Sequence, residues 1–189
     1  MSAKARDPWV DVKTRHGLPA DEIISSLQKE IRRGNTENAA LIAYEMATTS
    51  PELEAYLWKR LLVISVEDVG WGDLQAPVLV NSLFQMISAL DRQDGERLLY
   101  VVHAVRYLCA CKKDRSSDEM INWILRAVED GGVLPQIPDY AVDMHTARGQ
   151  QMGRSVRHFL EEGSKLAPEL EGRDTSYRER WLKLLDANK

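Results

Sequence analysis

The stretch 50–72, SPELEAYLWKRLLVISVEDVGWG, carries the clearest helical pattern in the chain. Ser50 and Pro51 form a typical helix start, with the serine as cap and the proline in the first turn. The apolar residues that follow recur every three to four positions and predict one buried helix face. That helix is predicted to reach Asp68 and to be broken by 70–72. Its apolar stripe consists of Leu53, Leu57, Leu61 and Ile64.

The same periodicity continues on both sides of this helix. No segment alternates as a β-strand does, and the short connections favour antiparallel neighbours. The sequence therefore predicts an all-α fold, a helical bundle. Further helices are predicted over 21–33, 36–47, 74–90, 96–110, 117–129, 143–162 and 177–185.

The chain has 189 residues, which suits one domain with terminal extensions. Residues 1–20 are predicted to form an irregular N-terminal arm from which Trp9 could dock on the body. Residues 21–172 are predicted to form the helical domain. Residues 173–189 are predicted to add a C-terminal helix that docks on the domain or extends from it.

Composition excludes several classes of protein. The 25 basic and 29 acidic residues give a net charge of −4, which argues against coating nucleic acid by bulk charge. No apolar run is long enough for a membrane span, and the N-terminus does not resemble a signal peptide, so we expect a cytoplasmic protein. Cys109 and Cys111 point apart on a helix and have no second pair, so we expect no metal. No phosphate-cradling glycine motif occurs, so we expect no cofactor.

Three acidic residues gather around a glycine turn after the helix described first. Glu67, Asp68 and Asp73 could hold a divalent ion. They could equally cap the following helix or pair with Lys59 or Arg60. Carboxylates at a helix C-terminus face an unfavourable dipole, so a compensating partner is expected. We favour the structural interpretation.

The segment 139–149, DYAVDMHTARG, is the most unusual local text. Tyr140, His145 and Arg148 concentrate around one expected helix start, where a phosphate or carboxylate could bind. In the alternative interpretation Asp143 is a simple cap and two nearby glycines mark a close helix crossing. If the three side chains converge, the chain is a small helical ligand-binding protein or enzyme.

Basic residues further along suggest a third role. Residues 145–160 contain Arg148, Arg154 and Arg157 and no acid. A helix carrying Arg154 and Arg157 could contact DNA phosphates, and its affinity would then fall steeply with salt.

Residues 24–117 resemble the C-terminal helical region of the replication-associated recombination protein A family, which belongs to the Werner-helicase-interacting-protein group of AAA+ ATPases. Four segments carry the likeness in order: 24–34, 38–44, 56–70 and 95–113. The third ends in Glu67-Asp68-Val69-Gly70, where the family has a serine at the position of Val66. At the end of the fourth, Lys112 stands where the family has a proline.

The resemblance implies a fold like the collar of clamp loaders and a non-catalytic module for oligomerisation or interaction in DNA replication, recombination or repair. The ATPase module is missing from the likeness, so we expect a stand-alone relative. Implied partners are further copies of the chain in a dimer or tetramer, DNA or replication proteins, and an AAA+ ATPase on another chain. Glu67, Asp68 and Gly70 would have a structural role. The implied phosphate contacts are Lys29, Arg32, Arg33, Lys112, Lys113 and Arg115.

Overall fold

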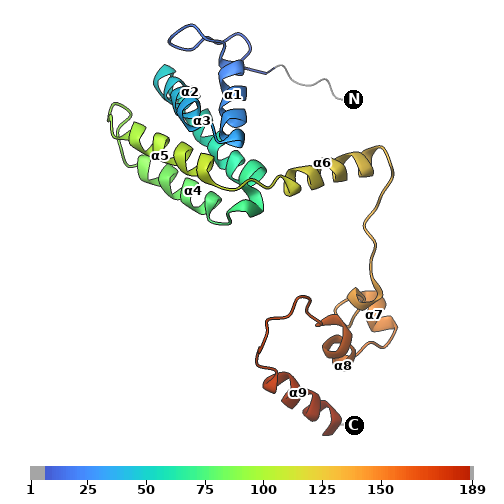
Figure 1. Cartoon of the computed structure of the whole chain (residues 1–189). Coiled ribbons are helices and arrows are strands. Elements are labelled where there is room, and N and C mark those ends of the chain that lie inside the picture. The colour runs from blue at the N-terminus through green and yellow to red at the C-terminus, as the bar shows by residue number, and fades with distance from the viewer. Residues whose placement is uncertain (1–6, 188–189) are drawn as a thin grey trace. The chain divides into compact units, whose positions relative to one another are not determined.

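The computed structural model describes residues 7–187, and every regular element in that range is helical (Figure 1). The chain divides into two compact units, Met1–Gly131 and Gly132–Lys189. This boundary falls inside the range 21–172 for which the sequence predicts one domain. None of the described helices is long and apolar enough to cross a membrane.

Unit 1 is built on five helices whose ends follow local capping rules. Gly34 takes a left-handed conformation (φ 76°) and ends α1, and Ser50 accepts a hydrogen bond from the backbone N–H of Leu53 at the start of α3. The predicted helix 74–90 is shorter in the structure, since it begins at Ala76 and ends at Ile87. The five are α1 (Ala20–Arg33), α2 (Thr36–Thr49), α3 (Pro51–Ile64), α4 (Ala76–Ile87) and α5 (Arg97–Ala110).

The core of unit 1 lies between these helices. Leu27 and Ile31 of α1, Trp58 of α3 and Leu108 of α5 are at most 1% exposed. Helix α5 contacts α1 to α4, as expected for a helix that is apolar on most sides. The prediction of an all-α bundle is confirmed.

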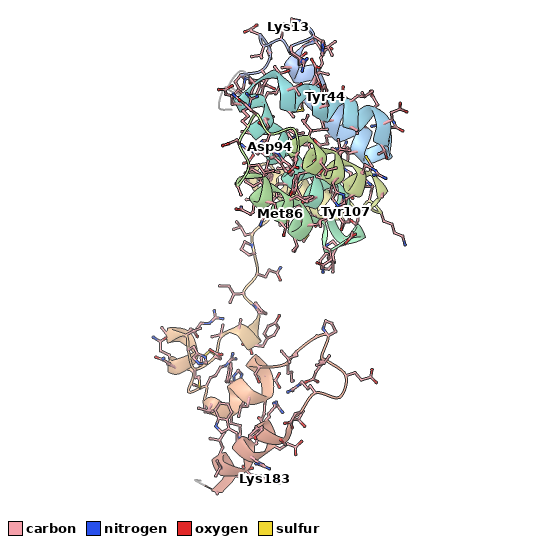
Figure 2. All side chains as sticks on the ribbon, turned by 90° about the vertical axis from the view of Figure 1, so that its left-hand side faces the viewer. Lys13, Tyr44, Met86, Asp94, Tyr107 and Lys183 are labelled. Carbon is pink, nitrogen blue, oxygen red and sulfur yellow. The ribbon has the colours of Figure 1, made fainter. Side chains whose placement is uncertain are left out.

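The N-terminal arm folds back on the bundle. The ring of Trp9 lies 5.3 Å from that of Tyr56, and the backbone N–H of His16 donates to Glu45 in α2. Lys13, labelled in Figure 2, forms an isolated bridge with Pro19. The arm is irregular and Trp9 docks, as predicted for these residues. Residues 1–6 of the predicted arm lie outside the described residues.

Helix α3 does not stop at its predicted end. It continues as a π-helix, η1 (Ser65–Val69), and a short 3₁₀ turn, η2 (Gly70–Gly72). After α5 a short connector leads to α6 (Ser116–Glu129), which contacts η1 near its start and then projects away from the bundle (Figure 1). No residue of α6 is buried.

Unit 2 contradicts the prediction of one helix over 143–162. The segment is broken because Gly153 adopts φ 70° after α7, and because Thr146 starts α7 by accepting a hydrogen bond from the backbone N–H of Gly149. No room remains for a β-carbon at Gly149, where it would lie 1.8 Å from the carbonyl oxygen of Asp143. The elements are η3 (Asp139–Ala141), α7 (Ala147–Gln151), α8 (Val156–His158), η4 (Phe159–Gly163) and α9 (Ser176–Ala187).

Candidate interaction surface around helix α6

Asp68 is the centre of a polar cluster that joins three parts of unit 1. The π-helical turn places its carboxylate inward, where it is 0% exposed. It accepts hydrogen bonds from Arg32 of α1, from Nη1 of Arg115 at 2.7 Å and from Nε2 of Gln28 at 2.8 Å. Glu67 accepts from Gln28 and Arg115 at the rim. We call these five residues the η1 cluster.

The cluster keeps Asp68 ionised. Burial by itself raises the pKa of the Asp68 carboxyl, but the hydrogen bonds from Arg32, Gln28 and Arg115 outweigh it, so the net pKa is lowered. The pKa of Arg115 is raised, chiefly by its hydrogen bond to Asp68. Both partners therefore stay charged at neutral pH, and the paired charges fasten α1, η1 and the start of α6 to one another.

Two glycines fasten the connector before α6. A β-carbon on Gly70 would lie 2.4 Å from the carbonyl oxygen of Asp114, and one on Gly72 would lie 2.4 Å from that of Lys112. The backbone N–H of Asp114 donates to the carbonyl of Asp68 at 3.0 Å. We call this close backbone contact the glycine clamp. Because the clamp and the η1 cluster both hold the connector, α6 starts from a fixed point.

The apolar face of α6 is much wider than a helix against one neighbour needs. At about 100° per residue, its apolar side chains cover an arc of about 200°, whereas a stripe of roughly 100° faces the core in a typical surface helix. Contiguous exposed apolar surface of this kind marks interaction sites. The residues of this face that are exposed are Met120, Ile121, Trp123, Leu125 and Val128.

One side of this face borders an apolar groove. The groove has a volume of about 460 Å³ and lies between the end of α3, Val66 of η1 and Ile121 of α6. A second groove, lined by Trp71 and Leu74, also includes Val66. Val66, 53% exposed, therefore lies where the two grooves meet. The residue that departs from the family pattern is the one that makes this surface continuously apolar.

The predicted ligand residues lie in unit 2. His145 is exposed, with Nδ1 3.1 Å from Oδ2 of Asp143 and its ring edge-on to Phe159 at 5.1 Å. Asp143 accepts from the backbone N–H of His145, and these bonds lower the pKa of its carboxyl. Tyr140 and Arg148 are also exposed and form no hydrogen bond with His145 within residues 7–187. A binding role for the three residues stays a prediction.

Most of the cations predicted to contact nucleic acid have partners within the chain. Besides Arg32 and Arg115 in the η1 cluster, Nζ of Lys113 donates to the carbonyls of Leu108, Cys109 and Cys111 and so caps α5. The three remaining paired cations are also engaged: Arg33 with the carbonyl of Lys29, Arg154 with both carboxylate oxygens of Asp139, and Arg157 with Glu161 and Asp186.

Two of the predicted cations remain accessible at the surface. Lys29 is exposed and donates to Ser25, and Lys112 is exposed with no ion pair to any residue between 7 and 187. Their contact with DNA stays a prediction.

The cysteines fit packing roles. Burial raises the pKa of the Cys109 thiol, and burial together with the nearby Asp73 carboxylate raises that of Cys111. Asp73 accepts a hydrogen bond from the hydroxyl of Tyr107 at 2.8 Å. Across residues 7–187 no group of three or more histidine, cysteine, aspartate or glutamate side chains is arranged to hold a metal ion.

Sequence reasoning predicts the helix 117–129 but misses that its apolar face is left uncovered. The available signal is the width of the apolar arc, which exceeds what one neighbouring helix covers. The partners of Asp68 are missed as well, since Arg32 and Arg115 lie 36 and 47 residues away along the chain.

A bundle of short antiparallel helices, with an inward aspartate at the end of its third helix, places unit 1 among the helical domains that follow AAA+ ATPase modules. The sequence model described as "MgsA AAA+ ATPase C terminal" matches residues 34–164. The chain belongs to this family. The resemblance stated from the residues alone is thereby confirmed.

Bacterial relatives agree with this assignment. The chain is 30% identical over 124 residues to replication-associated recombination protein A of Haemophilus influenzae. It is 29% identical over 135 residues to the Bacillus subtilis protein of that name and over 124 residues to that of Escherichia coli K12. The matches cover 66–71% of this chain and 26–31% of the relatives. The chain therefore spans about a quarter to a third of the proteins that it matches.

Proposed function

We propose that this chain is a non-catalytic helical interaction module that self-associates and works in DNA replication, recombination or repair. Membership of the family supports the cellular process, because relatives over most of the chain carry the name replication-associated recombination protein A. The observation that carries self-association is α6, a helix of 14 residues with a wide apolar face and no buried residue.

The engagement of the candidate catalytic groups supports a non-catalytic role. Asp68 and Glu67 are neutralised by arginines, and Asp143 is used to shape the turn before α7. A general acid or base needs a pKa near the working pH. The pKa values of Asp68 and Asp143 are lowered, away from neutral pH.

The proposal includes partners and place. We propose an AAA+ ATPase on another chain as one partner, because the matched region of the relatives is the C-terminal part of an AAA+ ATPase. DNA or replication proteins are further partners of the proposal, and the cytoplasm is its location. Co-purification from native cells, analysed for AAA+ proteins and clamp-loader subunits, tests the partners; their absence would contradict this part.

Self-association is tested by sedimentation velocity of the full chain from low to high micromolar concentration. We expect the average mass to rise above 21.5 kDa with concentration. Trp123→Asp places a charge on the apolar face and should return the protein to a monomer with an unchanged circular dichroism spectrum. A wild-type protein that stays monomeric at high micromolar concentration would remove the proposal of self-association.

A further inference from the structure

The apolar face of α6 has two sides with different surroundings. On one side Ile121 lines the groove against Val66 of the same unit. On the other side Met120 and Trp123 are 61% and 60% exposed, with Ala127 one turn further along. Met120, Trp123 and Ala127 are spaced three and four residues apart, which is the spacing of the seam of a coiled coil. We call these three residues the α6 seam.

Charged residues flank the seam in a pattern that distinguishes between orientations. Glu119 and Arg126 are seven residues apart, so they occupy equivalent positions on the same edge of the seam. Both are exposed, and neither forms an ion pair with any residue from 7 to 187. Glu129 lies further round the helix, on the polar side.

We propose that α6 pairs with α6 of a second copy of this chain, antiparallel, with the seams in contact. If Trp123 packs against Met120 of the second copy, Glu119 of each helix comes opposite Arg126 of the other. Twofold symmetry repeats this ion pair at both ends of the contact. In a parallel pair Glu119 would instead face the apolar Ile124, so the charges specify the antiparallel arrangement.

The structure also explains how such a small seam can be specific. The glycine clamp and the η1 cluster fix the start of α6, so little ordering of the helix root is required on association. The occupant is a second copy because the seam complements itself in both shape and charge. This inference rests on the proposed self-association and specifies the surface that produces it.

Charge reversal in the full chain tests the arrangement. Glu119→Arg alone and Arg126→Glu alone each turn two attractions into two repulsions per dimer, and should raise the dissociation constant about tenfold. The double variant Glu119→Arg/Arg126→Glu restores both pairs and should return to within about threefold of wild type. Glu129→Arg, with the same change of charge on the polar side, is the matched control and should leave association unchanged.

The double variant separates pairing from helix stability. Glu119 lies in the first turn of α6 and Arg126 in the last, where both favour the helix dipole. Reversing both makes the helix less stable, so recovered association can only come from contacts between copies. Circular dichroism of each variant monitors the helix.

The outcomes are distinct. If wild type associates and the charge reversals act like the Glu129→Arg control, the antiparallel seam is wrong while self-association stands. If single and double reversals weaken association equally, the pairing of Glu119 with Arg126 is wrong. If wild type stays monomeric, both this inference and the self-association it rests on fail. Loss in the single variants with recovery in the double variant supports the seam.

Discussion

Helices α1 and α6 have the same pattern of sequence and opposite surroundings. Each has 14 residues, two acidic side chains in the first turn, at least one basic side chain in the last turn and a strongly amphipathic distribution. Helix α1 buries Leu27 and Ile31 completely, whereas α6 buries nothing. Amphipathicity therefore predicts that a face will be covered, without saying whether the same chain or another copy covers it.

The largest effect is expected where α1 enters the core. Leu27→Ala removes a fully buried side chain and leaves a cavity among α1, α2 and α5. The free energy of unfolding should fall by about 2–5 kcal/mol. Urea denaturation followed by circular dichroism measures this. A loss below about 0.5 kcal/mol, the range of surface substitutions, would contradict the burial of α1.

A slightly smaller loss is expected for Asp68→Asn, because Asp68 serves both helices. The variant leaves Arg32 and Arg115 without their buried carboxylate, and removing one member of a buried pair costs about 3–5 kcal/mol. Both arginines are about 30% exposed, so water compensates part of this, and we expect about 2–3 kcal/mol in urea denaturation. Asp118→Asn, at the rim, is the control and should cost less than about 1 kcal/mol.

Acid should reveal the same residue. The pKa of Asp68 is lower in the folded protein than its ordinary value of 3.8, so its ionisation stabilises the fold above that value. This stability is lost as the pH falls below 3.8 toward the folded pKa. Urea midpoints measured between pH 7 and pH 3 should therefore fall less in Asp68→Asn than in wild type. Parallel acid profiles for the two proteins would contradict the linkage.

The smallest effect is expected on the exposed face of α6. Leu125→Ala shortens a side chain that is 49% exposed, so unfolding of the dilute monomer should change by less than about 0.5 kcal/mol. Urea denaturation at low protein concentration measures it. A loss comparable with that of Leu27→Ala would mean that α6 is covered within its own chain, and would end the contrast between the two helices.

The helices of unit 1 could be predicted from sequence because their signals are local. Gly34, Ser50 and the apolar stripe of α3 each act within one or two turns, so the predicted ends lie close to the observed ones. The helix predicted over 143–162 failed because Gly153 interrupts it in a left-handed conformation. Periodicity alone does not distinguish a glycine that packs inside a helix from one that ends it.

The site was less predictable because its partners are distant in sequence. The acidic pair at 67–68 was expected to need compensation, and Lys59 and Arg60 were the nearest cations. Nη2 of Arg60 lies 4.0 Å from Glu67, but Asp68 takes its partners from α1 and from the connector before α6. Tertiary folding brings those segments together, and no local pattern records it.

The glycine clamp has a mechanical consequence. A helix of 14 residues is about 21 Å long, so α6 acts as a lever whose tip moves roughly 4 Å for every 10° of tilt at its base. That displacement approaches one helical turn, enough to shift one lever against another by a whole step. Gly70 and Gly72, which touch nothing outside their own fold, thereby set the alignment of a contact made two nanometres away.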